Sequence, residues 1–486
     1  MKVFLVCAAA AAAVAAAKPE QMCVAREPED SNRGTRDSKK GRRDKGQQGG
    51  PQRQGQLGGP LCAGRVAPKN SLVSPLLTPL LAPTHPCSFI TTTGVAGEMA
   101  VSWVTAGSAA SSEVVAFGAR SGALSSNATG TSSVFTDGGA IDAITIHVAT
   151  LTGLAAATQY FYQVPGGAEL AFTNQPARAG GAVNAILADF GFVNDVAMDA
   201  LLSQVAAGAF DAVIHAGDLA YNLQDSKGAV GNDFMNAISP AVARVPYYTV
   251  PGNHEADVGD SFGNFKARFA AVSQLGASSG SGSNLYYSWT DAAVGAHYVA
   301  IDTEMWSYGG TPAEIAAQGK WLEADLAAVD RAATPWVIAY GHKAPWMDKT
   351  NWGAYFTTLF AKYNVNIYFC GHTHNYQRTL PAAADAPTDP GCLSKGNSVY
   401  TNCTGTAFIV TGSPGCKEKL STGTAPAGIL QTHFQAYGFG ALKVNSTHLE
   451  WTWTETVQEG GGAAGGELVA VPREAAQSDH VLLVRA

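Results

Sequence analysis

The sequence predicts an α/β protein with stacked, mostly parallel strands flanked by helices, preceded by a smaller all-β domain. The first observation is that short apolar runs alternate with longer helical patterns in the second part of the chain. This alternation is typical of βαβ units. The strand-like runs are Ala185–Ala188, Ala212–Ala216, Tyr247–Val250, Trp336–Tyr340 and Val365–Cys370, and the helical patterns are Met198–Ala207, Phe234–Val245, Ala316–Ala332 and Tyr355–Tyr363.

The second observation concerns residues 83–176, where the pattern changes to short strands at the spacing of a β-sandwich. Glu98–Val104 alternates apolar and polar residues over most of its length. The turn at Leu151–Leu154, just before Thr158–Tyr162, resembles the corner of a fibronectin type III domain. No chemistry is visible in this unit, so its expected role is to pack beside the next domain or to bind a partner. Further strands are expected at Glu113–Ala119, Ile144–Leu151 and Gln159–Val164, and, closing the core sheet, at Thr406–Gly412, Phe439–Val444 and Leu449–Glu455.

The third observation is that each apolar run of the α/β part ends next to a polar motif. In α/β sheets, sites form outside the carboxyl ends of the strands. Because all the motifs lie there, we expect them to converge on one crevice. The motifs are Asp189-Phe190-Gly191, Gly217-Asp218-Leu219-Ala220-Tyr221, Gly252-Asn253-His254-Glu255, Gly341-His342 and Gly371-His372-Thr373-His374.

Taken singly, these residues also have structural explanations. Asp and Asn are common in turns and at helix N-caps, a single Tyr often packs on a surface, and a single His is often a hydrogen-bonded structural residue. Taken together, carboxylates, a phenol, a carboxamide and imidazoles are oxygen and nitrogen donors for Fe, Zn or Mn. The carboxylate of Asp218 is the natural bridge between two ions, and ions about 3.5–4 Å apart clamp the attacking and leaving oxygens in phosphatases and nucleases. The motifs therefore predict hydrolytic chemistry at a two-metal centre.

These motifs resemble those of the purple acid phosphatases, a branch of the binuclear metallophosphoesterases. The last motif extends here to Gly-His-x-His-x-x-x-Arg, ending at Arg378. The wider superfamily usually has His at the position of Gly191 and lacks a ligand at Tyr221, whereas a tyrosinate on Fe(III) gives the purple family its colour. The resemblance covers roughly residues 86–455. It implies a metallophosphoesterase β-sandwich core flanked by helices over residues 182–457 and a fibronectin type III-like domain before it.

The resemblance also implies a function and a site. The implied enzyme is a secreted acid phosphatase in which metal-bound hydroxide attacks a phosphomonoester in line. His254 is expected to face the phosphate or its leaving group, and Asn253 and His254 to stabilise the phosphoryl oxygens. The implied ligands of Fe(III) are Asp189, Asp218, Tyr221 and His374, and those of a divalent ion (Zn, Fe or Mn) are Asp218, Asn253, His342 and His372.

One departure from the family leaves the general acid open. The plant enzymes carry two adjacent histidines about nine residues beyond the His342 position, where this chain has Asn351 and Trp352. His254, Lys343, Lys349 or water could protonate the leaving group.

Two alternatives to phosphomonoester hydrolysis stay open. Phosphodiesters, nucleotides or inositol phosphates would be chosen by the pocket walls, which we expect in loops at 257–283 and 305–315. A non-catalytic glycoprotein that binds a partner is the other alternative, and the complete ligand set argues against it. Some family members are dimers, so a homodimer is a further option.

The amino-terminal sequence predicts export. Residues 1–17 combine Lys2, an apolar run and Ala15-Ala16-Ala17, as in a signal peptide, and the run is shorter than the roughly 20 residues that span a bilayer. We therefore expect a secreted protein, or one in a secretory compartment, without a membrane span. Residues 18–82 are expected to be disordered, with a basic tract at 33–45 that fits a propeptide, a linker or a tether to an anionic surface. Residues 458–486 are expected to form a flexible tail.

Composition and cysteine usage agree with an exported globular protein. A net charge of −7 gives no basic footprint for nucleic acid. Cys392 and Cys403 flank a short loop and could pair, and so could Cys23 and Cys62, while Cys370 is the expected buried thiol. Sequence alone does not fix this connectivity. Asn-x-Ser/Thr sequons occur at Asn127, Asn402 and Asn445.

Overall fold

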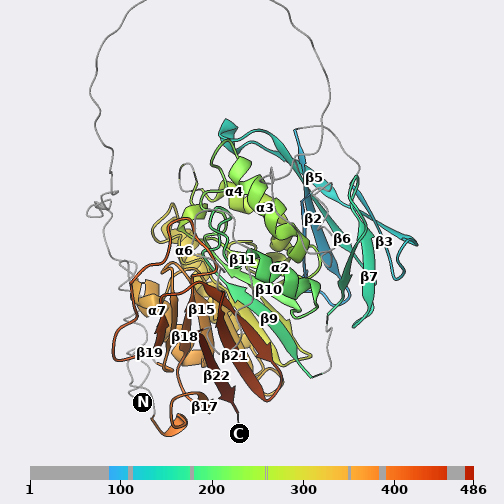
Figure 1. Ribbon diagram of the computed structural model, residues 1–486. Helices are drawn as coiled ribbons and strands as arrows, with labels where there is room; N and C mark the ends of the chain where they lie inside the picture. Colours follow the sequence, from blue (N-terminus) through green and yellow to red (C-terminus); the bar gives the residue numbers. More distant parts are fainter. Residues whose placement is uncertain are drawn as a thin grey trace, which may run out of the picture. The chain divides into compact units, whose positions relative to one another are not determined.

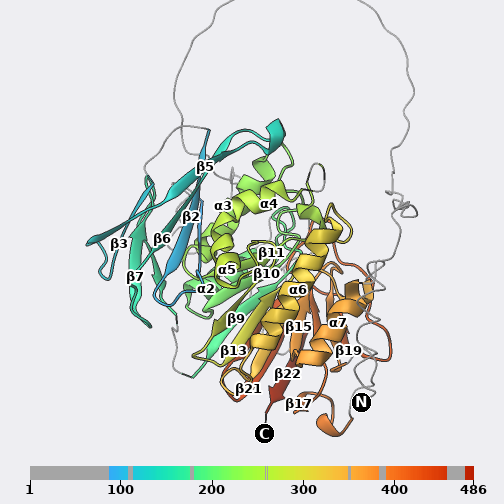
Figure 2. The same ribbon diagram turned by 180° about the vertical axis from the view of Figure 1, so that it is seen from behind.

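The computed structural model describes residues 87–107, 113–175, 180–257, 259, 261–347, 352–382, 390–456 and 477–485. The expected signal peptide, the basic tract, Lys349, Asn351 and the pairing of Cys23 with Cys62 lie outside these residues. Figures 1 and 2 show the predicted α/β fold, with a separate all-β unit at its amino-terminal side. In the part of the chain that the structure describes, no helix is long and apolar enough to span a lipid bilayer.

The all-β unit consists of two four-stranded antiparallel sheets packed face to face. Trp103, Phe117 and Tyr162 lie in the core between them. The phenol of Tyr162 reaches past this core and donates a hydrogen bond to the carbonyl of Ala243, 2.8 Å away in the α/β unit. The sheets are, in spatial order, β1 (Ser88–Thr91), β2 (Met99–Ala106), β6 (Ile144–Leu151) and β5 (Thr131–Phe135), and β4 (Ser126–Thr129), β3 (Val114–Gly118), β7 (Gln159–Gln163) and β8 (Leu170–Thr173).

The α/β unit is built on two seven-stranded sheets. One has the order β11 (Tyr247–Val250), β10 (Ala212–Ala216), β9 (Ala182–Leu187), β20 (Gly438–Val444), β21 (His448–Glu455), β22 (Ser478–Val484) and β17 (Val399–Thr401). The other has the order β12 (Tyr287–Asp291), β13 (Ala296–Ala300), β14 (Trp336–Tyr340), β15 (Ile367–Cys370), β18 (Ala407–Thr411), β16 (Tyr376–Thr379) and β19 (Leu430–Phe434).

Both sheets are mixed rather than mostly parallel. The strands that precede the polar motifs are parallel to their sequential neighbours, β9 to β11 in one sheet and β13 to β15 in the other. β18 extends the second parallel run beside β15. Antiparallel strands adjoin these runs, with β20 beside β9, β12 beside β13 and β16 beside β18. The parallel part of each sheet is therefore the part that presents the motifs.

Helices cover the outer faces and produce an α/β/β/α layering. Along β14, Ile338 and Tyr340 point into the core shared by the two sheets, while Val337 and Ala339 pack with residues of α6 and α7. Figure 2 shows α6 and α7 lying against this face. The helices are α2 (Met198–Ala206), α3 (Ala229–Val242), α4 (Gly263–Arg268), α5 (Ser273–Ser278), α6 (Pro312–Ala328) and α7 (Trp352–Tyr363).

Several sequence expectations need correction here. The helices expected to begin at Phe234 and Tyr355 begin at Ala229 and Trp352, as α3 and α7. The segment expected as a wall loop at 257–283 contains α4 and α5. Helix α6 begins at Pro312 rather than Ala316, because Thr311 and Glu314 form a capping box. Residues 478–484 of the expected flexible tail form β22, which pairs with β21 and β17. Val481 and Leu483 are buried by that pairing, which supplies the stabilisation that a short apolar segment lacks alone.

Candidate metal centre

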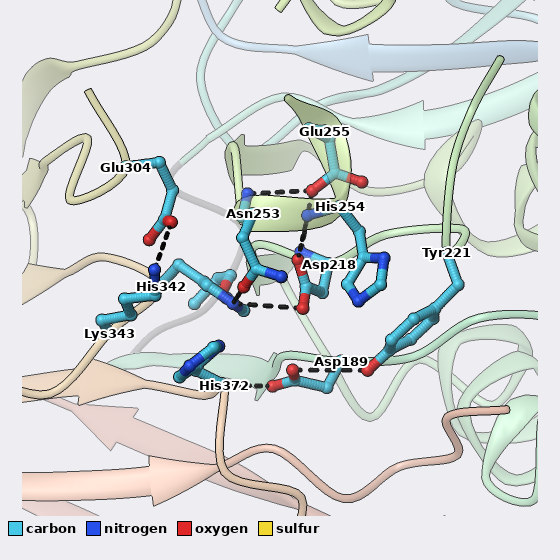
Figure 3. A network of polar contacts seen from close by, with 12 residues as sticks. Asp189, Asp218, Tyr221, Asn253, His254, Glu255, Glu304, His342, Lys343 and His372 are labelled. Carbon is cyan, nitrogen blue, oxygen red and sulfur yellow. Dashed lines mark hydrogen bonds and ion pairs between the residues drawn. The ribbon is translucent and has the colours of Figure 1, made fainter. Parts of the chain in front are cut away.

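The predicted site residues follow the carboxyl ends of parallel strands in both sheets. Figure 3 shows the side chains of the labelled members of this set gathered around one space. The sequence therefore identified residues that the fold brings together, although the motifs span positions 189 to 374. Asp189 follows β9, Asp218 and Tyr221 follow β10, Asn253 and His254 follow β11, His342 follows β14, and His372 and His374 follow β15.

One group of donors is formed by Asp218, His342 and His372, whose ligand atoms lie within 4.8 Å of one another. Nε2 of His342 lies 3.2 Å from Oδ2 of Asp218 and 3.1 Å from Oδ1 of Asn253. Nδ1 of His342 is 3.0 Å from the carbonyl of Ala216, which accepts its proton and leaves Nε2 as the donor atom toward the group.

A second group is formed by Asp189, Asp218 and His374, again within 4.8 Å. Nε2 of His374 lies 3.0 Å from the Tyr221 phenol oxygen and 3.4 Å from Oδ1 of Asp189. Nδ1 of His374 lies 2.9 Å from the carbonyl of Lys419, so this imidazole is also held with Nε2 toward the group. Asp218 is the member that both groups share.

The backbone around these donors is held in an uncommon conformation. Asp189, Asp218, Tyr221 and His372 have positive φ angles of 57°, 52°, 58° and 66°, in the left-handed region that non-glycine residues seldom adopt. The buried carboxylate of Glu255 fixes the Asp218 turn by accepting hydrogen bonds from the amides of Asp218 and Leu219, both at 2.9 Å. Such strain persists at functional sites when the surroundings enforce it.

The buried carboxylates of the two groups favour a positive charge beside them. Burial would raise the pKa of Asp218, but the neighbouring His342 imidazolium outweighs burial and lowers it. Burial would lower the pKa of His342, and Asp218 instead raises it to about 10. Burial raises the pKa of Asp189, which is fully inaccessible. Buried carboxylates of this kind are normally paired or coordinate metals.

The donor set fits two metal ions that share one carboxylate. Donors held about 2.1 Å from one ion lie roughly 3 Å apart. The separations within each group, 3.0–3.4 Å from Nε2 of His342 or His374 to its oxygen partners, match this spacing. Both imidazoles also have the second-shell carbonyl that metal-binding histidines usually have.

His254 lies at the accessible side of the site and is not a member of either group. Its Nδ1 is 2.9 Å from Oδ1 of Asn222, its Nε2 is 3.5 Å from Glu418, and its ring centre is 4.6 Å from that of Tyr221. Its backbone amide donates to Oδ1 of Asp218 at 2.9 Å. His254 is thus tied to the shared carboxylate while its imidazole remains about one-fifth exposed.

The other candidates for the general acid are less available. Lys343 forms a 2.7 Å ion pair with Glu304, which is fully buried (Figure 3). Trp352, which stands where the plant enzymes have one of their two histidines, opens α7 and is buried against Phe356, so it does not replace that histidine as an acid. Among the described candidates, His254 is therefore the one that is partly exposed, lies beside the donor groups and is not held in a short ion pair.

Four residues of the site were not predicted from the sequence. Asn222 and Glu418 contact His254, the Lys419 carbonyl holds His374, and Cys416 lies against the same imidazole. Three of these belong to the segment 412–421, which follows β18. The strand expected at Thr406–Gly412 could have indicated this segment. It forms β18, which is parallel to β15, so its carboxyl end lies at the same edge of the sheet as the end of β15.

Comparison with known proteins agrees with this geometry. Residues 185–376 match the calcineurin-like phosphoesterase family, residues 86–176 the purple acid phosphatase N-terminal domain, and residues 405–463 the iron/zinc purple acid phosphatase-like protein C family. A Mus musculus relative, acid phosphatase type 7, is 33% identical over 398 residues, covering 76% of this chain and 86% of the relative. The chain belongs to the purple acid phosphatase family.

Other members show the same relationship. Purple acid phosphatase 22 of Arabidopsis thaliana is 28% identical over 329 residues, covering 63% of this chain and 68% of the relative. The structure of purple acid phosphatase PPD1 from yellow lupin seeds has the same fold, with a TM-score of 0.62 at 20% identity, covering 84% of this chain and 75% of that one. As a purple acid phosphatase, this chain is a phosphatase, and family membership implies a binuclear metal centre.

Proposed function

We propose that this purple acid phosphatase hydrolyses phosphomonoesters at a centre of one Fe(III) and one divalent ion. The observation that carries the proposal is the pair of donor groups that share Asp218, with Tyr221 beside only one of them. A tyrosinate is a hard oxygen donor, so the Tyr221 side suits Fe(III). The other side, built from imidazoles and a carboxamide, suits Zn, Fe(II) or Mn(II).

The proposed ligands are those expected from the sequence. Asp189, Asp218, Tyr221 and His374 would hold Fe(III), and Asp218, Asn253, His342 and His372 would hold the divalent ion. Two bound ions supply Lewis-acid polarisation of a phosphoryl group and make water easier to ionise.

The protein's own residues position the metal ligands and stabilise charge on the phosphoryl group. Glu255 fixes the turn that aims Asp218, and the carbonyls of Ala216 and Lys419 orient two imidazoles. His254, which Asn222 holds on its Nδ1 side, presents an exposed edge toward the phosphoryl oxygens or the leaving group. Together with Asn253 it would stabilise the charge that develops on those oxygens.

We also propose that the protein enters the secretory pathway. The described residues contain a disulfide between Cys392 and Cys403, a bond that persists mainly in oxidising compartments. Two sequon asparagines, Asn127 and Asn402, are exposed. The amide nitrogen of Asn445, the atom that would carry a glycan, is instead 3.0 Å from Nε2 of His448, so we expect glycans at the first two positions only.

The test is metal analysis combined with a visible spectrum and hydrolysis of an aryl phosphate at acidic pH. Two metals per chain including iron, a visible band and turnover are expected. Tyr221→Phe should remove the band, whereas Tyr355→Phe, on the exposed side of α7, should leave it unchanged. A colourless protein with two divalent ions that cleaves phosphodiesters would contradict the iron assignment and support the diesterase alternative. A protein that stays metal-free and inactive after iron is supplied would support the binding glycoprotein.

A further inference from the structure

The segment 412–421 holds His374 from several directions. The Lys419 carbonyl lies 2.9 Å from Nδ1 of His374. The backbone amide of His374 donates to Oγ of Ser421 at 2.9 Å, and the amide of Ser421 donates back to the His374 carbonyl at 3.0 Å. This segment therefore fixes both the main chain and the ring of a proposed iron ligand.

Cys416 is the buried side chain of this segment that reaches the same ring. Its Sγ lies 3.1 Å from Nδ1 and 3.5 Å from Nε2 of His374, and the residue is fully inaccessible. Its position is enforced from both sides, because its amide donates to the Phe190 carbonyl at 2.7 Å and the amide of Glu418 points at its sulfur at 3.3 Å. Its φ of 77° places it in the left-handed region, as for four of the proposed ligands.

The phenol of Tyr221 contacts the same imidazole. Its oxygen is 3.0 Å from Nε2 of His374, the nitrogen that lies 3.5 Å from the Cys416 sulfur. The His374 ring is therefore in contact with both the thiol and the phenol, and Tyr221 and His374 are two of the three donors found only on the proposed iron side.

We propose that Cys416 is a positioning residue for the iron side of the centre, acting through His374 and Tyr221. This inference rests on the proposed function, because it assigns Cys416 a role only if those two residues hold a metal. The competing explanation is that Cys416 merely fills space. Cys370 provides the comparison, since it is equally buried but its sulfur lies 3.6 Å from the carbonyl of Ile409, on the strand next to its own.

The experiment compares Cys416→Ala, Cys416→Ser and Cys370→Ala in the full chain, each loaded with iron and zinc. Alanine and serine keep a Cβ, so the backbone strain at 416 is unchanged. Removing a second-shell partner typically weakens metal affinity about 10–100-fold. We expect Cys416→Ala to lose iron affinity by that factor and to shift the visible band. Cys416→Ser, which keeps a hydroxyl that can hydrogen-bond, should recover most of both, and Cys370→Ala should match the wild type in both.

The outcomes separate this inference from the proposed function. A wild type with iron and a visible band, together with an unchanged band and iron affinity in Cys416→Ala, would overturn the inference alone. A sulfur-to-metal charge-transfer band in the Co(II)-loaded wild type, absent from Cys416→Ser, would also overturn it, because the thiol would then be a ligand itself. A wild type that binds no metal would overturn both. The melting temperature of each metal-free variant shows whether a loss of iron affinity arises from misfolding. If Cys416→Ala does not fold, the position of the visible band in Cys416→Ser, compared with the wild type, tests whether the sulfur acts on the iron side.

Discussion

Nε2 of His342 lies 3.2 Å from Oδ2 of Asp218, although the two residues follow strands of different sheets. Asp218 is the second residue after β10, and His342 is the second residue after β14. The contact therefore joins the two halves of the sandwich at the edge where their parallel strands end. Asp218, which is 1% exposed, belongs to both donor groups, so this contact lies where the two groups meet.

The first prediction follows from this shared position. Asp218→Ala should remove both metals and reduce activity to background, because neither group keeps its common carboxylate. Metal content per chain and aryl phosphate turnover measure the two losses. Asp199→Ala, an exposed residue of α2, is the control and should keep both metals. Full activity in Asp218→Ala would show that the bridging assignment is wrong.

The second prediction concerns Gly252, whose backbone lies close to the carboxylate of Asp218. A Cβ added at Gly252 would lie 2.2 Å from Oδ1 of Asp218, closer than any real contact. Because the φ of Gly252 is −106°, alanine fits its backbone and the effect is steric alone. Gly252→Ala should therefore displace the carboxylate and lower metal affinity at least tenfold. Gly428→Ala, where a Cβ meets nothing within 4 Å, should bind metal normally. Equal metal affinity in the two variants would contradict the prediction.

The convergence of the candidate metal donors was predictable from sequence, because one rule places them at the same edge of the fold. Asp189, Asn253 and His372 each come just after a short apolar strand, and parallel strands end at a common edge. The same rule applied to β18 would have drawn attention to Cys416. The contact of the Lys419 carbonyl with His374 was not predictable, because every residue has a carbonyl and only the folded path of the chain decides where it points.

The errors in the fold have similar causes. The start of α6 was readable from the capping box of Thr311 and Glu314 and from Pro312 at the first helical position, but the apolar pattern alone suggested a later start. The seven residues of β22 carry too little signal to be called a strand by themselves. Their structure depends on β21 and β17, which lie beside them only in the folded chain. Tertiary pairing thus decided a segment that local pattern left undetermined.

The third prediction concerns the buried ion pair beside the centre. The side chains of Lys343 and Glu304 are 12% and 0% exposed. Burial alone would lower the pKa of Lys343, but the negative charge of Glu304 has the larger effect and raises it. Removing one partner of a buried pair costs about 3–5 kcal/mol, because the other charge is left unpaired. Glu304→Gln should destabilise the metal-free protein by this order. Denaturant unfolding measures it, and Glu323→Gln, which breaks the exposed pair with Lys362, should change little. Equal effects of the two substitutions would show that the Lys343 pair adds no stability.

The fourth prediction concerns the anchor of β22. Two guanidinium nitrogens of Arg378 contact the two carboxylate oxygens of Asp479 at 2.5 and 2.8 Å, and the phenol of Tyr376 donates to the same carboxylate at 2.6 Å. Burial would raise the pKa of Asp479, but the hydrogen bonds and charge of Arg378 outweigh it and lower the pKa. We call this two-point contact between Arg378 and Asp479 the Arg378–Asp479 fork. It joins β22 to β16, a strand of the other sheet.

The sign of the pH dependence follows from this lowered pKa. The Asp479 carboxyl binds a proton less readily in the folded chain than in the unfolded chain, where its pKa is about 3.9. Its contribution to stability is therefore complete above that value and is lost as the pH falls through the lower folded value. Asp479→Asn should be less stable than the wild type at neutral pH, and the difference in unfolding free energy should shrink as the medium is acidified below about pH 4. Glu450→Gln, a partly exposed carboxylate on the adjacent β21, should follow the wild-type curve. A gap between Asp479→Asn and the wild type that is independent of pH would show that the loss comes from packing and not from the charge of the fork.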